Sequence, residues 1–454
     1  MNPLLSDYYG GLEPRADYSV RRPLSLGGGY FRWGKDNVCY GRSASGFRHG
    51  RVDAALYDTA ADVQIHGSKV VMPFDLAEVV ENLRRERYCA HFREEKRLPN
   101  SLVRSLYYLV RPYLSVPVRK HLQRFHLRHW RKIQFPEWPV DLTVDRLHRQ
   151  WLALFMRARG LEKMPFIWFW PDNCSSCAII THDVEDPQGK DYCQQLMDLD
   201  ESFGFRSSFQ VVPEDRYPVS EDYLASIHNR GFEVNVHDLK HDGLLFAEHG
   251  EFIKRAERIN EYGRRFRACG FRSGIMYRNA DWYDALDFMY DMSIPNVAHL
   301  DPQRGGCCTV MPFFIGDMVE LPLTCTQDYT LFNILEDFTT SLWEQQIELI
   351  MANHGLITIL VHPDYIVEPR ANRTYRALLN YLSNLRETHG IWTPLPRDVA
   401  SWWRRRSQMH LEYRNGSWQV EGYGSERACV AYAHLAGNTV SYSLAGAEME
   451  AVAS

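Results

Sequence analysis

The sequence predicts an α/β protein, because short apolar strands alternate with longer amphipathic helices through most of the chain. We expect strands at 178–184, 207–212, 233–237, 270–274, 294–298 and 356–362, and helices at 190–203, 220–230, 251–268 and 341–354. This alternation is typical of a parallel sheet, either open or closed into a barrel.

Ionisable residues stand at the ends of three of these strands. Asp183 and Glu185 end the first strand region, His237 ends the third with His241 four residues later, and His362 ends the last. The carboxyl ends of parallel strands meet at one edge of a sheet, where the active sites of such folds gather. We therefore expect these five side chains to lie together.

Length and composition restrict the class of protein. A chain of 454 residues predicts two or three domains, and a net charge of −5 argues against a polyanion-binding protein. The first residues show no basic stretch followed by an apolar core, and no apolar run reaches 18 residues. We therefore expect a cytoplasmic protein whose ten scattered cysteines are reduced.

Residues 1–164 precede the main domain and predict an α+β accessory region. Its start is rich in glycine and aromatic residues, with short strands expected at 61–66 and 69–72. Asp75 then precedes a helix, which is predicted by apolar residues at helical spacing (Leu76, Val79, Val80 and Leu83).

A basic segment follows, with fourteen Lys or Arg against three Glu between 84 and 132. Prolines divide it into two predicted helices, 101–111 and 118–132. A basic amphipathic segment can lie on an anionic membrane, so peripheral membrane contact through 101–132 on the inner face is one interpretation. The alternative is a solvated helix packed on the main domain. We expect no nucleic-acid partner, because no recognised module accompanies the charge.

The main domain is expected to span 165–405, after a proline-rich linker at 135–139 and a helix at 145–159. Residues 406–454 predict a small β appendage. Asn415-Gly416 is a strong hairpin-turn signal between the runs 410–413 and 417–420.

The histidine pair indicates a metal site. His237 and His241 converge if the chain turns helically after its strand, and a carboxylate from a neighbouring strand would complete a set of three ligands. Such a set leaves a position for water, as catalytic zinc sites do.

Five short motifs occur in a fixed order between 178 and 364. They are Thr181-His182-Asp183-Val184-Glu185, then His237 with His241, Arg272 in the run 270–277, Asp328 in the run 321–329, and Leu360-Val361-His362. In type and order they resemble the polysaccharide deacetylases of carbohydrate esterase family 4. The resemblance implies a distorted (β/α) barrel.

The resemblance also implies roles for these residues. Asp183 would be the general base, and Glu185, His237 and His241 the metal ligands; Asp183 itself or Asp186 could be the carboxylate ligand instead of Glu185. His362 would be the general acid. Arg272 would hold the base or line the groove, unless it forms only a structural salt bridge, and Asp328 would orient the acid.

Three positions depart from the family's motifs. Asp238 stands where Ser or Thr is usual, Gly274 replaces a proline, and the motif around Asp328 is poorly kept. The run 242–246 is similar to the same segment in a subgroup of this family, whose genes lie near bacterial envelope-polysaccharide genes.

These features predict a metal-dependent hydrolase that removes an N-acyl group from an amino sugar of a surface polysaccharide or its precursor. N-acetyl is the first candidate for this acyl group. Its cofactor would be one divalent metal, with Zn²⁺ ahead of Co²⁺, Ni²⁺ or Fe²⁺. Two alternatives stay open, namely an amidase acting on a ureide or formamide and an inactive glycan-binding or scaffold protein.

Overall fold

The computed structural model describes residues 7–11, 18–46, 49–52, 55–89, 124–125 and 127–445. The predicted basic helix at 101–111 and the start of the one at 118–132 lie outside the described residues, so the membrane interpretation stays a prediction. Among the residues that are described, no helix combines the length and the apolar character needed to cross a membrane.

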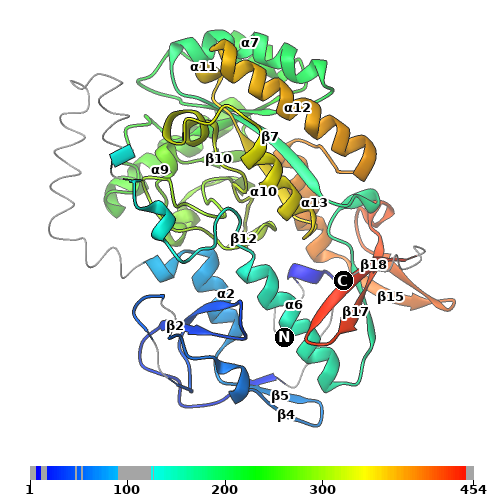
Figure 1. Ribbon diagram of the computed structural model, residues 1–454. Helices are drawn as coiled ribbons and strands as arrows, with labels where there is room; N and C mark the ends of the chain where they lie inside the picture. The colour runs from blue at the N-terminus through cyan, green and yellow to red at the C-terminus, as the bar shows by residue number, and fades with distance from the viewer. Residues whose placement is uncertain are drawn as a thin grey trace.

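The centre of the molecule is an eight-stranded, mostly parallel sheet, and the predicted α/β class is confirmed (Figure 1). The strand order is β12-β13-β11-β10-β9-β8-β7-β14, and only β12 runs antiparallel to its neighbour. The strands are β7 Cys177–Val184, β8 Ser208–Val211, β9 Glu233–His237, β10 Gly270–Arg272, β11 Tyr290–Asp291, β12 Phe313–Ile315, β13 Met318–Glu320 and β14 Leu356–Leu360.

The inner strands are covered on their outer side by helices, as their continuous apolar runs predict. All eight residues of β7 are buried, and apolar side chains such as Phe209, Val234 and Ile359 join one core with helix residues such as Leu196 and Leu378. The covering helices are α7 Pro187–Ser202, α8 Glu221–His228, α9 His249–Phe266, α10 Ser341–Met351 and α12 Pro369–His389.

Single hydrogen bonds, not a continuous ladder, link the two ends of the sheet. Beyond β13, Leu323 N donates to Ile294 O (3.0 Å) and Leu323 O accepts from Asn296 N (2.8 Å). Two residues on, Cys325 N donates to Thr358 O of β14 (3.3 Å). The sheet therefore curls round on itself. The predicted strand at 294–298 is wrong, because regular pairing ends with β11 and only these isolated bonds continue it.

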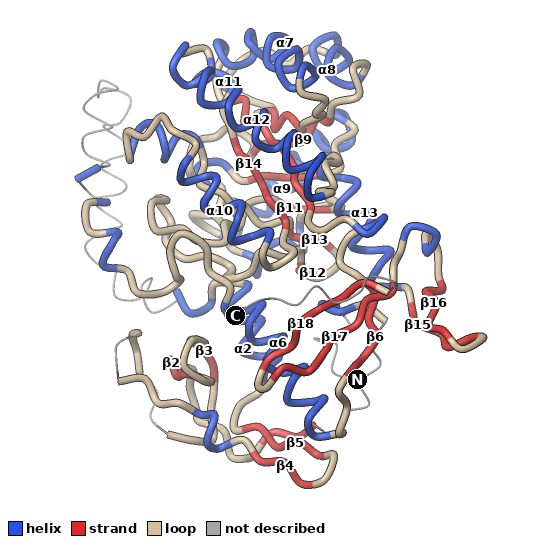
Figure 2. Tube along the Cα trace, turned by 45° about the vertical axis from the view of Figure 1, so that its right-hand side comes forward, coloured by secondary structure: helices blue, strands red, loops and turns tan. Residues whose placement is uncertain are grey.

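The segments before and after the sheet are packed together (Figure 2). Strand β6 (Lys163–Ile167) pairs with β17 (Val430–Ala436), which pairs in turn with β18 (Thr439–Leu444). Helix α6 (Thr143–Ala158) packs against these strands. On α13 (Pro396–Gln408), buried Arg406 donates to Tyr8 O (2.9 Å) and Ile167 O (2.7 Å), tying the N-terminal segment to β6.

The N-terminal region contains the predicted helix and strands, except that the strand predicted at 61–66 begins only at Gln64, after a 3-10 turn at Thr59–Asp62. Strands β4 (Gln64–His66) and β5 (Lys69–Met72) pair with each other and β5 with β1 (Tyr18–Val20); β2 (Gly29–Arg32) and β3 (Val38–Gly41) form a hairpin. Asp75 accepts a hydrogen bond from Ala77 N (3.0 Å) and caps α2 (Leu76–Arg84).

The predicted C-terminal hairpin is also present. Strands β15 (His410–Arg414) and β16 (Ser417–Glu421) pair across Asn415 and Gly416, whose φ angles are 52° and 83°. The domain boundaries stay a prediction, and β6 crosses the one expected between 164 and 165.

Candidate metal and catalytic site

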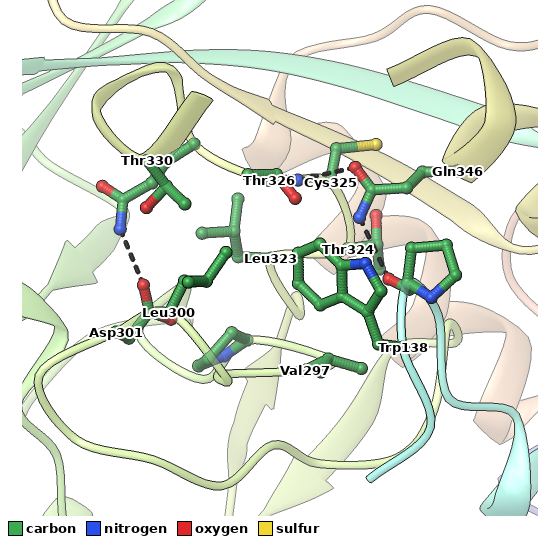
Figure 3. Close-up of a pocket in the computed structure, with 13 residues that line it drawn as sticks. Trp138, Val297, Leu300, Asp301, Leu323, Thr324, Cys325, Thr326, Thr330 and Gln346 are labelled. Atoms are coloured by element: carbon green, nitrogen blue, oxygen red, sulfur yellow. Dashed lines mark hydrogen bonds between the residues drawn. The ribbon is translucent and has the colours of Figure 1, made fainter. Parts of the chain in front are cut away.

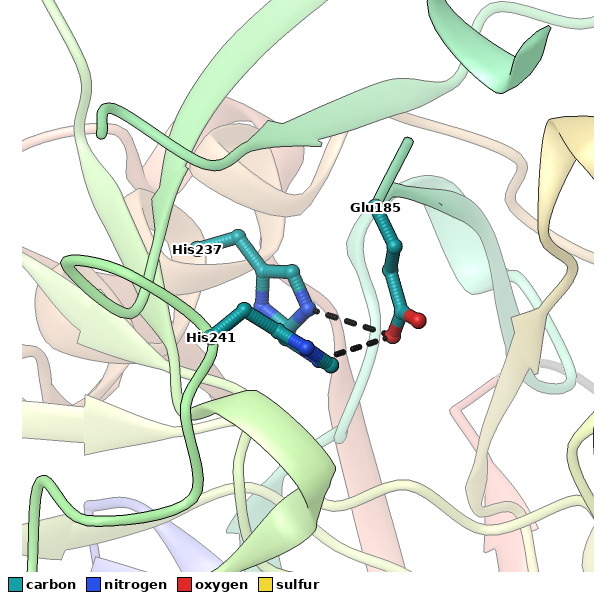
Figure 4. Close-up of side chains that lie close together, drawn as sticks. All are labelled: Glu185, His237 and His241. Carbon is teal, nitrogen blue, oxygen red and sulfur yellow. Dashed lines mark ion pairs between the residues drawn. The ribbon is translucent and has the colours of Figure 1, made fainter. Parts of the chain in front are cut away.

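The strand ends bring Glu185, His237 and His241 together, as the sequence predicts (Figure 4). Glu185 Oε1 lies 2.9 Å from His241 Nε2 and 3.7 Å from His237 Nε2. The histidines are buried, whereas the Glu185 side chain is 23% exposed, so solvent reaches the group from that side. Burial disfavours the ionised form of Glu185, but His241 and its other histidine neighbours outweigh burial and hold the pKa of its carboxyl well below the usual range.

The orientation of His237 is fixed by its other nitrogen. Its Nδ1 lies 3.1 Å from the backbone oxygen of Arg272, which can only accept a hydrogen bond. Nδ1 therefore carries a proton, and Nε2 faces Glu185. The Nε2 atoms of both His237 and His241 are buried and form no hydrogen bond among the described residues.

These residues fit a divalent metal. Four ligands held tetrahedrally at about 2.0–2.1 Å lie about 3.3–3.4 Å from one another, close to the observed separations. A second group of three possible ligands, Asp183, Glu185 and His362, shares the same glutamate. Two histidines and one carboxylate form a known catalytic zinc set, and buried lone pairs without hydrogen bonds are what a cation would satisfy.

Asp183 of β7 is held by Arg272, which ends β10, three strands further along the sheet. Arg272 Nη1 donates to Asp183 Oδ1 (2.7 Å) and to Thr181 Oγ1 (2.9 Å), while its Nε donates to Met292 O (3.0 Å). Burial opposes ionisation of Asp183, but the charge of Arg272, with His237 and His362, outweighs burial and lowers the pKa of the carboxyl. An ionised carboxylate therefore stands 3.6 Å from His237 Nε2.

His362, which follows the strand paired with β7, is held by Asp328. The imidazole Nδ1 lies 2.6 Å from Asp328 Oδ1, and His362 Nε2 lies 3.4 Å from Glu185 Oε1. Burial disfavours the imidazolium, but Asp328 and Glu185 outweigh burial and raise the pKa of His362 well above its usual value. His362 is thus suited to carry a proton into the site.

Asp186, which the sequence left as an alternative carboxylate ligand, and Asp238, which departs from the family's motif, have other positions. Asp186 Oδ1 accepts from Gly189 N (2.7 Å) as the N-cap of α7. Asp238 Oδ1 accepts from Leu239 N (2.6 Å), while its buried Oδ2 has no hydrogen bond among the described residues. Neither belongs to the two groups of ligand atoms. Thr181 belongs to the first motif but received no role from the sequence, although it lies two residues before Asp183 and hence on the same face of the strand.

A small pocket lies against the connection that carries Asp328, and its labelled residues are seen in Figure 3. Trp138 of the accessory region covers one side, and Asp301 lies on another. Asp301 Oδ1 accepts from Gln327 Nε2 (3.0 Å), and Gln346 Nε2 donates to Pro139 O (3.0 Å). The accessory region therefore contacts the loops beside the site.

Comparison with known proteins gives structural matches only. No family model matches the chain, and no curated protein matches its sequence. Among solved structures it is similar to a Mycobacterium smegmatis protein described as a polysaccharide deacetylase, with 18% identity and a TM-score of 0.42 over 52% of this chain and 93% of that one. A Puue allantoinase gives 11% identity and a TM-score of 0.42 over 52% and 92%.

A further match is a Bordetella bronchiseptica protein described as a polysaccharide deacetylase involved in O-antigen biosynthesis. It shares 20% identity, with a TM-score of 0.33 over 51% of this chain and 86% of that one. Polysaccharide deacetylases are thus among the solved structures to which about half of this chain is similar, as its motifs predict.

Proposed function

We propose that this chain is a metal-dependent hydrolase that removes an N-acyl group from an amino sugar of a surface polysaccharide or its precursor. N-acetyl is the first candidate for this acyl group. The observation that supports this most is the meeting of two buried histidine nitrogens with one carboxylate oxygen. The assignment of amide hydrolysis rests on Asp183 and His362, which lie beside these ligands. The assignment of a glycan substrate rests on the motif resemblance.

Amide hydrolysis needs an activated water, a stabilised oxyanion and a proton for the leaving amine. Asp183, kept ionised by Arg272, would accept the proton of the attacking water. His362, kept protonated with the help of Asp328, would donate a proton to the departing nitrogen. These two groups would therefore divide the base and acid roles between them.

Glu185, His237 and His241 would hold the metal, with Zn²⁺ first and Co²⁺, Ni²⁺ or Fe²⁺ as alternatives. When bound, a divalent metal supplies Lewis-acid chemistry, which polarises a carbonyl and eases the deprotonation of water.

The first test is the metal content of the purified protein by elemental mass spectrometry, in the wild type and in His237→Ala. Near-stoichiometric metal that is lost in the variant supports the proposal. His228→Ala is the matched control, because His228 lies beside the backbone oxygen of Phe266 (3.0 Å) and outside the ligand groups. It should keep its metal.

Activity is then measured as acetate released from N-acetylated glycans. Formation of a carboxylate from ureides, or release of formate from formamides, would favour the alternative substrates instead. Absence of metal from the wild type, even after reconstitution with each of the four metals, would contradict the hydrolase and favour a binding protein.

A further inference from the structure

The loop that follows Arg272 forms one wall of the proposed site, and its far end is held by the accessory region. Arg278, at this far end, is buried and faces Glu86, which lies 192 positions earlier in the chain. We propose that Glu86 is a positioning residue for the site: through Arg278 it holds the loop 273–278 against the metal-binding residues. This inference rests on the proposed function.

The contact is a two-pronged buried ion pair. Glu86 Oε2 accepts from Arg278 Nε (2.7 Å), and Glu86 Oε1 accepts from Arg278 Nη2. The same Oε1 accepts from Gly306 N (2.6 Å), and Tyr88 OH donates to Gly306 O (2.8 Å). Two parallel hydrogen bonds of this kind fix the orientation of the guanidinium as well as its distance from the carboxylate. Glu86 therefore joins the loop after β10 to the loop after β11.

Arg278 connects Glu86 to the loop that forms the wall of the site. Its Nη1 donates to Met276 O (2.7 Å), and the Met276 side chain packs with Leu323 and Leu360 in a small separate apolar cluster. Leu360 lies two residues before His362, hence on the same face of the chain. The carboxylate of Glu86 is thus connected to the surface beside the proposed acid.

The loop also needs an external restraint. Ile275 and Met276 have φ angles of 58° and 54°, a left-handed conformation that costs free energy in residues with a branched or bulky side chain. At Gly274 an added Cβ would lie 2.4 Å from Asp238 Oδ2 and 2.9 Å from His241 Cδ2, so the backbone passes directly over the proposed ligand His241 and its neighbour Asp238. Such a conformation persists only when its surroundings fix it.

The near end of the loop is anchored independently. Arg272 is fixed by Asp183, Thr181 and Met292, none of which depends on Glu86. Loss of Glu86 should therefore leave the metal-binding residues in place and release the wall. This separates a positioning role from a general loss of structure.

A second ion pair between the same two segments provides a control. Arg87 Nη2 lies 2.8 Å from Asp281 Oδ1, but both side chains are more than two-fifths exposed. An exposed pair of this kind contributes little, because water screens it. Arg87→Gln should therefore leave the wall unchanged.

The test uses the full-length protein loaded with Co²⁺ and titrated with acetohydroxamate, whose methyl group represents that of an acetyl group. Binding is followed by visible absorption of the Co²⁺. For Glu86→Gln we expect Co²⁺ affinity within twofold of wild type and acetohydroxamate affinity at least fivefold weaker. Glu86→Asp, which keeps the charge, should recover part of the loss, and Arg87→Gln should match wild type in both measurements.

Acetohydroxamate affinity within twofold of wild type in Glu86→Gln, or its absence in a Co²⁺-binding wild type, would overturn the inference. If Glu86→Gln does not fold, Arg278→Lys decides, because it keeps a cation and cannot form the two parallel hydrogen bonds. It should show the same selective loss, and wild-type acetohydroxamate affinity in this variant would likewise overturn the inference. A wild type that binds no Co²⁺ contradicts the proposed function, and the inference with it.

Discussion

Asp328 binds His362 at two points with one carboxylate. Its Oδ1 lies 2.6 Å from the imidazole Nδ1, and its Oδ2 accepts from the backbone nitrogen of the same histidine (2.7 Å). The ring is thereby fixed relative to its own backbone, with Nε2 facing Glu185. A carboxylate in this position selects the Nδ1–H form and stabilises the imidazolium.

Replacement of Asp328 by Asn should impair the proton donor without affecting the metal. The amide cannot stabilise the imidazolium, so the pKa of His362 should fall. We expect kcat to fall by about 10²-fold or more, since general acid steps are worth about 10²–10⁴-fold. The basic limb of the kcat profile should also move to lower pH. Asp337→Asn is the control, because Asp337 accepts from Thr339 on the same connection. An unshifted basic limb in Asp328→Asn would remove Asp328 from this role.

Asp183→Asn should abolish most turnover and leave the fold intact. The amide cannot accept the proton of the attacking water, so we expect kcat to fall by about 10²–10⁴-fold. Metal content by elemental mass spectrometry and the circular dichroism spectrum should stay close to those of wild type. Normal turnover in this variant would refute the assignment of Asp183 as base.

Glu185 and Asp186 are adjacent in sequence, but their contacts predict opposite effects. Glu185→Gln should weaken metal affinity by more than the roughly 10–100-fold that is typical of outer-shell partners. Asp186→Ala should keep its metal and lose about 1 kcal/mol of stability, because it removes the N-cap of α7. Metal titration and thermal unfolding of both variants check this. Metal loss in Asp186→Ala with retention in Glu185→Gln would reverse the assignment.

The part of the site that the sequence predicted is the part with a local signal. Buried parallel strands are nearly all apolar, so an ionisable residue at the end of one, such as Asp183 or His237, stands out in the sequence. Strand β11 has only two residues, and an apolar run beside it was mistaken for the strand. Glu86 and Arg278 give no local signal, because their meeting depends on how the accessory region packs against two loops.

A further buried carboxylate should make the stability of the fold depend on pH. Glu233 begins β9, whereas His237 ends it, so the two lie about 13 Å apart along the strand. Glu233 Oε1 accepts from Tyr290 OH (2.8 Å) and its Oε2 from Arg397 N (3.2 Å). Burial outweighs these bonds and raises the pKa of Glu233 from 4.5 to about 7.

Between pH 4.5 and about 7 the folded state then binds more protons than the unfolded state, so the contribution of Glu233 to stability is lost as the pH rises through this window. At about 1.4 kcal/mol per pKa unit, the stability lost is about 3.5 kcal/mol at most. Glu233→Gln imitates the protonated form and should remove this dependence. We expect its Tm to exceed that of wild type at pH 8 by several degrees more than at pH 5. Parallel Tm curves across this range would show that Glu233 is ionised at its ordinary pKa in the folded protein.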